Sequence, residues 1–197
     1  MRILVTGGAG LIGSNVVRKL ISLGHDVRVV DNLWRGKLEN LSENGRGVID
    51  FDNNFFKSDL RIYDNCISVS EGVDIVIHLA DIVAGINFVF SNELFVFRSN
   101  ILMNSNILDA AIFNKVKKII YVGTACSYPA EMQMKLNPPP FVEEDVYPAN
   151  PESSYGWSKL MGEYEFELAQ KEGKIQTEIL RLHNVYGPPC ELSPEKS

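Results

Sequence analysis

The sequence of 197 residues has few of the features that mark metal-binding, secreted or nucleic-acid-binding proteins. Its three cysteines, Cys66, Cys126 and Cys190, lie far apart and form no CxxC or Cys/His spacing, so we predict neither a disulfide framework nor a metal site. A net charge of −6 provides no basic excess for nucleic-acid binding. We therefore expect a protein of a reducing, cytoplasmic compartment that binds no nucleic acid.

Long apolar runs are also missing. No run reaches the roughly 18 residues that a membrane span requires. The apolar start is interrupted by Thr6-Gly7-Gly8 and no small-residue cleavage site follows, so we expect no membrane segment and no signal peptide. A hydrophobic content of 45% and a charged content of 22% are instead typical of a globular domain with a core of its own.

Short apolar runs alternate with segments of helical spacing along the chain. Strands are predicted near residues 3–5, 25–32, 55–60, 74–79, 117–123 and 177–182, and helices over 11–23, 91–114 and 151–172. Residues 33–52 are predicted as a loop or loose helix, and 132–151 as a proline-rich loop. The alternation predicts an α/β fold, a doubly wound parallel sheet with helices on both faces. One side of the helix over 91–114 is expected to carry Leu94, Ile101, Leu102, Ile107, Leu108 and Ala111.

A glycine-rich segment joins the first predicted strand to the first helix. Gly8 to Gly13 fit GxGxxG, and Gly7, Gly10 and Gly13 fit the spacing GxxGxxG. Glycines let the backbone turn sharply and approach a pyrophosphate, which the helix N-terminus attracts. Asp31, 18 residues after Gly13, can bind an adenosine ribose and would repel a 2′-phosphate. The segment therefore predicts a Rossmann domain that binds NAD in preference to NADP.

A second motif, YGWSK, places Tyr155 and Lys159 four positions apart on a predicted helix, so they share one face. A nearby ammonium lowers the pKa of a phenol because it favours the phenolate. The pair can then remove a hydroxyl proton while a hydride leaves for a nicotinamide. An exposed Tyr/Lys pair is common, but after a dinucleotide motif the pair predicts a dehydrogenase-type site.

Together these segments resemble the extended short-chain dehydrogenases/reductases of the NAD-dependent epimerase/dehydratase family, which act on sugar nucleotides. The resemblance covers nearly the whole chain and rests on TGGAGLIG (6–13), DN (31–32), DL (59–60), HLA (78–80), Asn100, GTACSYP (123–129), YGWSK (155–159) and RLHNVYGP (181–188). It implies NAD as the cofactor, a GDP- or UDP-hexose as the substrate and a homodimer formed through the long helices. It also implies an NAD-binding domain over 1–182, with 183–197 beginning a truncated substrate-binding region.

The resemblance gives a role to each matching residue. Thr124 matches the hydroxyl that binds the reacting sugar oxygen, Tyr155 the base, and Lys159 its activator, which also holds the nicotinamide ribose. Gly85 and Asn184 match positions on the substrate side. The other expected cofactor contacts are Gly7, Gly10, Leu11, Ile12, Gly13, Asp31, Asn32, Asp59, Leu60, Leu79, Ala80 and Asn100. The alternative role of Thr124 and of Asp59 is to cap the turn that follows each of them.

Cys126 narrows the resemblance within the family. The 4,6-dehydratases carry TDE where this chain has Thr124-Ala125-Cys126, so dehydration is not expected. TAC followed by Tyr-Pro is similar to GDP-mannose 3,5-epimerases and GDP-fucose synthases, in which the matching cysteine exchanges protons next to a transient C4 ketone. The resemblance implies an epimerase with Cys126 as acid/base. Two alternatives stay open: a UDP-sugar C4 epimerase in which Cys126 is a silent buried residue, and an NAD-binding module without catalysis.

Overall fold

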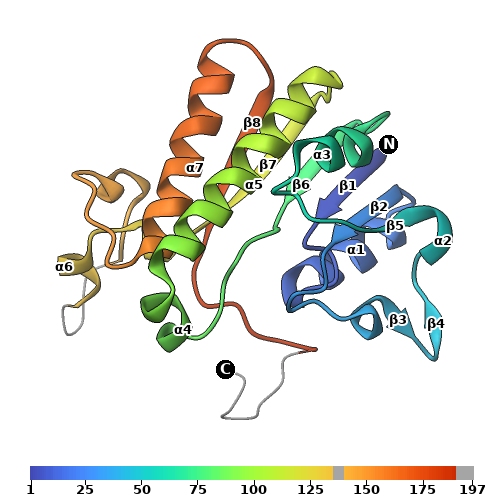
Figure 1. Ribbon diagram of the computed structural model, residues 1–197, viewed down its shortest axis with the longest axis horizontal. Helices are drawn as coiled ribbons and strands as arrows, with labels where there is room; N and C mark the ends of the chain where they lie inside the picture. Colours follow the sequence, from blue (N-terminus) through green and yellow to red (C-terminus); the bar gives the residue numbers. More distant parts are fainter. Residues whose placement is uncertain (135–139, 190–197) are drawn as a thin grey trace.

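The computed structural model describes residues 1–134 and 140–189. Within them runs a six-stranded parallel sheet in the order β5-β2-β1-β6-β7-β8 (Figure 1). This order is the doubly wound arrangement of a Rossmann domain. The predicted α/β class is therefore confirmed. The strands are β1 (Arg2–Thr6), β2 (Asp26–Asp31), β5 (Phe55–Lys57), β6 (Ile75–His78), β7 (Lys118–Thr124) and β8 (Gln176–Leu182).

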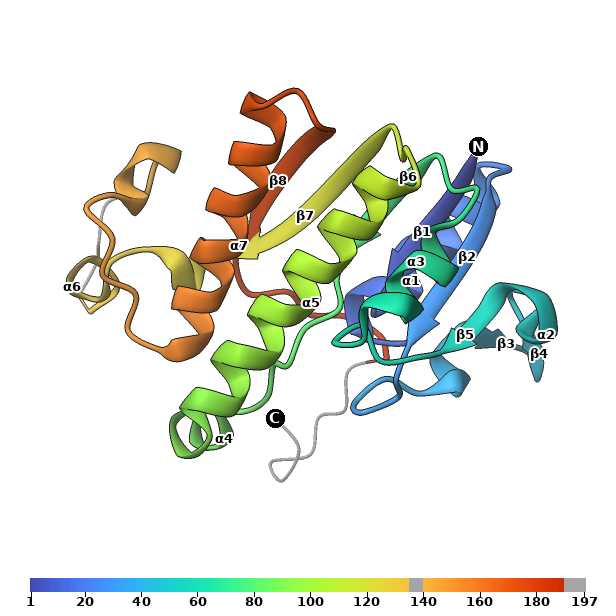
Figure 2. The same cartoon turned by 45° about the horizontal axis from the view of Figure 1, so that its top comes forward.

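Helices cover both faces of the sheet (Figures 1 and 2). On one face α3 (Tyr63–Ser70), α5 (Glu93–Phe113) and α7 (Ser154–Lys171) share a core with Leu4 of β1. On the other, α1 (Leu11–Ser22) packs against Ile3 and Val5 of the same strand. Successive side chains of a strand point to opposite faces, so a strand buried on both sides is a continuous apolar run.

The helix α1 is bounded by glycines. Its N-cap is Gly10, which offers no side chain to the first turn. Its last carbonyls accept from the backbone of Leu23 and Gly24, and Gly24 adopts a positive φ of 79°. Glycine reaches this left-handed conformation without strain and ends the helix there. The chain then turns directly into β2.

The structure corrects several predicted boundaries. The third strand ends at Lys57, two residues before Asp59. Helix α3 was not predicted, because it is only eight residues long and its buried side consists of Cys66, Val69 and Ser70. The helix predicted over 91–114 is α5, which begins two residues later because Asn92 separates it from a further helix, α4 (Ile86–Ser91). Shorter elements lie in the predicted loops: a 3-10 turn at Leu38–Leu41, β3 (Ser42–Glu43), β4 (Arg46–Gly47), α2 (Phe51–Asn54), α6 (Ala130–Gln133) and a 3-10 turn at Glu143–Val146.

The predicted apolar side of α5 is also partly wrong. Ile107 and Leu108 are buried, but Leu94 and Leu102 are 68% and 47% exposed. Helix α5 packs against α7 as well as the sheet, and its buried side includes the polar Asn100 and Asn104. Apolar spacing alone therefore did not identify the buried face. Among the helices of the described ranges, none has the length and apolar character needed to cross a bilayer.

Candidate functional site

A cleft of about 1590 Å³ lies at the carboxyl ends of β1 and β6. This is the topological switch point of the sheet, where the strand order reverses, and Rossmann domains bind ligands there. Among the described residues, Asp59, Asn100 and Cys126 are predicted site residues that do not line it. The predicted site residues that do are Gly7, Gly10, Leu11, Ile12, Gly13, Asp31, Asn32, Leu60, Leu79, Ala80, Gly85, Thr124, Tyr155, Lys159 and Asn184.

The glycines after β1 leave a cradle that side chains would fill. A Cβ on Gly7, which has a φ of 65°, would lie 2.9 Å from the backbone nitrogen of Ala80. A Cβ on Gly13 would lie 2.3 Å from the carbonyl oxygen of Gly7. The first turn of α1 receives no side-chain cap, so its amides are free for an anion. The shape and polarity of this cradle fit the pyrophosphate of a dinucleotide.

Asp31 ends β2 at the rim of this cradle. Its Oδ2 accepts from the amide of Ala9 at 3.0 Å, and its Oδ1 accepts from that of Leu33 at 2.8 Å. Burial raises the pKa of Asp31, while these two hydrogen bonds lower it. Each carboxylate oxygen can accept a second hydrogen bond. The side chain is therefore fixed, faces the cleft and retains acceptor capacity for ribose hydroxyls.

A buried histidine that sequence reasoning did not assign lies beneath the cleft. The hydroxyl of Thr6 accepts from the amides of Leu79 and Ala80, both at 3.0 Å. Both its lone pairs are then used, so it donates its own proton to Nδ1 of His78 at 2.8 Å. Nε2 of His78 consequently donates to Asn104 Oδ1 at 3.1 Å. This network joins the ends of β1 and β6 and keeps His78 neutral.

The N-terminal turn of α7 brings the YGWSK motif to the cleft. The Ser153 hydroxyl caps the helix by accepting from the amide of Gly156 at 3.2 Å. A Cβ on Gly156 would lie 2.2 Å from the carbonyl oxygen of Cys126. Glycine at 156 thus allows the helix to contact the turn that follows β7. As a result Tyr155 and Lys159 line the same cleft as Thr124.

Thr124 performs the capping role that was its alternative and also faces the cleft. Its Oγ1 accepts from the amide of Cys126 at 3.2 Å, which leaves the hydroxyl proton available to a ligand. Cys126 lies in the 3-10 turn Ala125–Ser127 and is exposed. The interpretation of Cys126 as a buried residue is therefore wrong. The Cys126 carbonyl closely approaches Gly156, the residue after Tyr155, so this turn lies beside the start of the YGWSK motif.

A buried ion pair supports this turn from below. Glu163 of α7 is 1% exposed and pairs with Arg181 of β8 at 2.7 Å. Ser127 Oγ donates to Glu163 Oε1 at 3.4 Å, and a Cβ on Gly123 would lie 2.4 Å from the same oxygen. Burial raises the pKa of Glu163, whereas Arg181 lowers it. Gly123 and Ser127 are thus the residue types that make room for this carboxylate and bind it.

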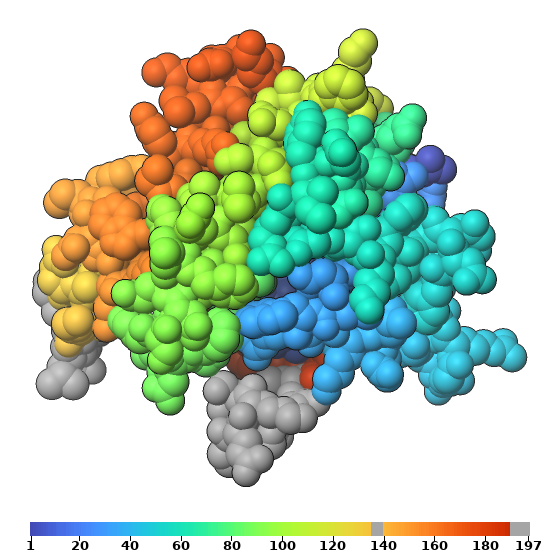
Figure 3. Space-filling view, viewed as in Figure 1, coloured from blue at the N-terminus to red at the C-terminus, as the bar shows by residue number. Residues whose placement is uncertain are grey.

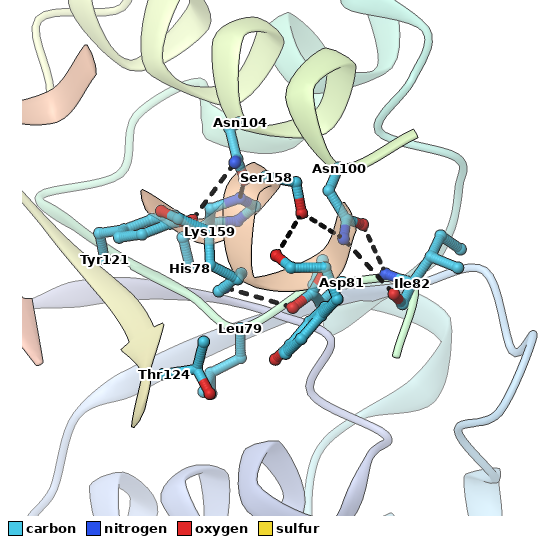
Figure 4. A network of polar contacts seen from close by, with 12 residues as sticks. His78, Leu79, Asp81, Ile82, Asn100, Asn104, Tyr121, Thr124, Ser158 and Lys159 are labelled. Atoms are coloured by element: carbon cyan, nitrogen blue, oxygen red, sulfur yellow. Dashed lines mark hydrogen bonds and ion pairs between the residues drawn. The ribbon is translucent and has the colours of Figure 1, made fainter. Parts of the chain in front are cut away.

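Asn100 and Asp59 use their polar groups within the protein. Asn100 Oδ1 accepts from the amide of Ile82 at 2.8 Å, and its Nδ2 donates to the Ser158 hydroxyl at 3.1 Å (Figure 4). Asp59 accepts hydrogen bonds from the Arg61 guanidinium at both carboxylate oxygens, and these bonds lower the pKa of Asp59. Both residues support the walls of the cleft. Their direct contact with a cofactor stays a prediction.

Asp81, which sequence reasoning missed, lies beside the YGWSK pair. Its Oδ2 is 3.3 Å from Lys159 Nζ, and the two side chains are 7% and 5% exposed (Figure 4). Lys159 Nζ also lies 4.5 Å from the centroid of the Tyr121 ring. The sequence feature that could have identified Asp81 is a carboxylate directly after the buried strand that ends in HLA. A charged residue there lies at the carboxyl edge of a parallel sheet.

Two segments meet across the mouth of the cleft. The Trp34 ring, after β2, lies 5.5 Å from that of Phe88 in α4, and Arg35 donates to the carbonyl of Val83 at 2.6 Å. Figure 3 shows this blue segment against the green α4 region. Asn184 lies after β8 on the remaining side. Of the predicted substrate-binding region, residues 190–197 lie outside the described residues.

Comparison with known proteins fits this geometry. Residues 3–196 match the NAD dependent epimerase/dehydratase family. The chain belongs to this family. It is 37% identical over 188 residues to GDP-mannose 3,5-epimerase 1 of rice (Oryza sativa subsp. japonica), covering 95% of this chain and 47% of the rice protein. The expected family membership is confirmed, and so is NAD as the cofactor of that family.

Solved epimerase structures share the fold. A UDP-glucose 4-epimerase from Thermotoga maritima, solved with UDP-glucose, superposes with a TM-score of 0.84 at 32% identity, covering 100% of this chain and 60% of that one. A UDP-glucose 4-epimerase from Thermus thermophilus, solved with NAD, gives 0.80 at 30% identity, covering 99% and 59%. The chain thus spans about half the length of the rice relative. Its residues form the Rossmann-fold part of the architecture that these solved epimerases share.

Proposed function

We propose that this chain is the NAD-binding part of a nucleotide-sugar epimerase that works by transient oxidation at C4 of a hexose. The observation that carries the proposal is one cleft lined by the Gly7–Gly13 cradle, Asp31, Thr124, Tyr155 and Lys159. Bound NAD would supply a reversible acceptor for the C4 hydride. A module that only binds NAD has no need of the last three residues. In this proposal residues 1–182 bind the cofactor, and 183–197 begin the substrate-binding region.

The proton chemistry falls to α7 and the end of β7. Tyr155 takes the proton of the sugar hydroxyl as the hydride departs and returns it later. Thr124, whose lone pair already accepts from the Cys126 amide, donates its proton to the same sugar oxygen. Lys159 lies one helical turn after Tyr155, and its ammonium lowers the pKa of Tyr155, opposing the burial that raises it. The helix thereby holds the base and its activator in a fixed relation.

Cys126 is proposed as the group that exchanges protons at C3 or C5. A C4 ketone acidifies the hydrogens on both neighbouring carbons, and a thiolate is a suitable base for them. The side chain is exposed beside Tyr155, just outside the dinucleotide cleft, where a sugar held at Thr124 would lie. The 37% identity to GDP-mannose 3,5-epimerase 1 favours this reaction and a GDP-hexose. A UDP-sugar C4 epimerase is the second candidate, supported by the fold shared with such enzymes.

Two measurements test the proposal. Native mass spectrometry of the 197-residue chain should show bound NAD, and turnover should be assayed on GDP- and UDP-hexoses in deuterated water. We expect Tyr155→Phe to lower turnover by at least about a hundredfold, the usual scale of general acid–base catalysis. Tyr164→Phe, on the exposed side of the same helix, is the matched control and should leave turnover unchanged.

The outcomes separate the candidates. Deuterium uptake at C3 or C5 that Cys126→Ser abolishes supports 3,5-epimerisation. Inversion at C4 with no dependence on Cys126 supports the C4 epimerase. Full turnover by Tyr155→Phe would exclude the oxidation mechanism. NAD binding without turnover, in this chain and in any longer form of the protein, would leave a cofactor-binding module.

We further propose that the protein forms a homodimer through α5 and α7. Both helices lie on one face of the sheet and pack against each other (Figure 2). Their outer sides expose apolar groups at a spacing of seven residues, Phe95 and Leu102 on α5 and Met161 and Leu168 on α7. Side chains seven apart lie on one stripe of a helix, and exposed apolar stripes are typical of interfaces.

The cytoplasm as the compartment stays a prediction.

A further inference from the structure

The carboxylate of Asp81 is buried at the edge of the cleft without full satisfaction of its oxygens. Oδ2 pairs with Lys159 Nζ at 3.3 Å, and Oδ1 has no hydrogen-bond partner within the described part of the chain. Burial raises the pKa of Asp81, while Lys159 and the nearby Tyr155 hydroxyl lower it. A buried charge with an unpaired oxygen is costly to fold around. Neither the cradle nor the sheet needs a carboxylate here, since the backbone of the segment is already held by Thr6 and Asn100.

The groups around Tyr155 define what this carboxylate can do. Asp81 reaches the site from the end of β6, Lys159 from α7, Cys126 from the turn after β7 and Tyr121 from β7 itself. Burial raises the pKa of Tyr155 most, the charges of Asp81, Cys126 and Tyr121 raise it further, and Lys159 alone lowers it. His78, beneath Lys159, is neutral. Lys159, whose charge favours the phenolate of Tyr155, is therefore ion-paired with Asp81, whose charge opposes it.

We propose that Asp81 is a positioning residue: its carboxylate holds the Lys159 ammonium at the end of β6 and thereby controls how readily Tyr155 releases its phenolic proton. Lys159 is held between the Asp81 carboxylate and the face of the Tyr121 ring (Figure 4). While this ion pair persists, much of the field of the ammonium at Tyr155 is cancelled. A ligand that draws Lys159 towards the cleft weakens the pair and makes Tyr155 a stronger acid.

This inference rests on the proposed function only in giving Tyr155 a catalytic task. The effect of Asp81 on the ionisation of Tyr155 can be measured on the ligand-free 197-residue chain. Tyrosinate absorbs in the ultraviolet, and the difference between each chain and its Tyr155→Phe counterpart isolates one of the seven tyrosines. We expect Asp81→Asn to lower the midpoint of the Tyr155 titration by at least about one pH unit, the scale of a charge within contact distance.

The control is an aspartate that pairs with a lysine elsewhere. Asp74 binds Lys117 at 2.7 Å near the other end of β6, on the exposed surface. Asp74→Asn should leave the Tyr155 midpoint unchanged. Asp81→Ala is the second variant, because it removes the carboxylate without burying an amide, and it should shift the midpoint in the same direction. A variant that unfolds when free would be titrated in sucrose together with the wild-type chain, because excluded osmolytes stabilise the folded state without binding the cleft.

An unchanged Tyr155 midpoint in Asp81→Asn would overturn the proposal. A shift in Asp81→Ala alone would overturn it too, since it would show an effect of packing and not of charge. In an active form of the protein, the acid limb of the kcat profile of Asp81→Asn should move to lower pH while KM is retained. A shifted titration without turnover in any form would refute the proposed function and leave this inference standing. Turnover together with an unchanged Tyr155 titration would support the proposed function and refute the role of Asp81.

Discussion

At the scale of single residues, His78 is a side chain that can ionise in water but is kept neutral by its surroundings in the fold. Both its ring nitrogens are committed, one accepting from Thr6 and the other donating to Asn104. A second ring proton would point at a hydroxyl oxygen whose lone pairs already accept from two amides. Burial, and to a lesser degree the Lys159 ammonium, lower the pKa of His78 to about 3.

This depressed pKa predicts how stability depends on pH. The unfolded histidine binds a proton below about pH 6.5, whereas the folded one does so only near 3. Between those values the unfolded state holds more protons, so the free energy of unfolding should fall by about 1.4 kcal/mol per pH unit from this group as pH decreases. We expect His78→Gln to be less stable at neutral pH and to lack this slope in urea titrations between about pH 6.5 and 5.

The control for this slope is His25→Gln, in the turn before β2. It should retain the pH dependence of the wild-type chain. Equal slopes in the wild-type and His78→Gln chains would show that His78 is protonated in the folded state as well.

At the scale of elements, the start of α7 sets where the base is held. Two adjacent serines lie there with different environments. The Ser153 hydroxyl accepts from the amide of Gly156 and so satisfies one of the free donors of the first turn. The Ser154 hydroxyl is buried and has no hydrogen-bond partner among the described residues. Removal of the hydroxyl oxygen should therefore change the free energy of unfolding differently at the two positions.

Ser153→Ala should lower the free energy of unfolding by about 1 kcal/mol, because the cap is lost. Ser154→Ala should be neutral or slightly stabilising, because an unsatisfied buried oxygen is removed. Urea unfolding of the two variants, which change the same atoms one position apart, gives a direct comparison. A loss at Ser154 as large as that at Ser153 would indicate a partner for its hydroxyl and contradict the geometry.

At the scale of the whole molecule, the homodimer that we propose makes the outer sides of α5 and α7 the surfaces to test. The exposed apolar side chains there are Phe95 and Leu102 of α5 and Met161 and Leu168 of α7, which are between 37% and 47% exposed. We expect Leu102→Glu to weaken the proposed homodimer at least about tenfold, since a charge buried in an apolar interface stays unpaired. Sedimentation velocity over a range of concentrations would measure this dissociation.

The control for assembly is Leu23→Glu, the same substitution at an exposed leucine that follows α1, on the opposite face of the sheet. It should leave the association unchanged. A wild-type chain that stays monomeric at every concentration would refute the proposed interface.

The sequence alone was sufficient to predict the sheet and to select the glycines, Asp31, Tyr155 and Lys159 that the structure brings to one cleft, while their binding and catalytic roles stay predictions. These depend on short-range patterns: apolar runs that form buried strands, glycines where a backbone must approach closely, and a spacing of four on a helix. The turn that bears Cys126 was predicted in place, but its exposure was not, because exposure depends on what packs over a residue. The buried side of α5 was partly mispredicted for the same reason.

Only the tertiary structure decided the polar environment of the site. Asp81 comes from the segment that follows β6 and Lys159 from α7, and Thr6 and His78 come from β1 and β6. Glu163 determines from α7 which residue fits at Gly123 in β7. Each partner is distant along the chain, and parallel strands joined by crossovers place their carboxyl ends together. Local patterns fix which elements form, whereas ion pairing and pKa depend on which side chains those elements bring into contact.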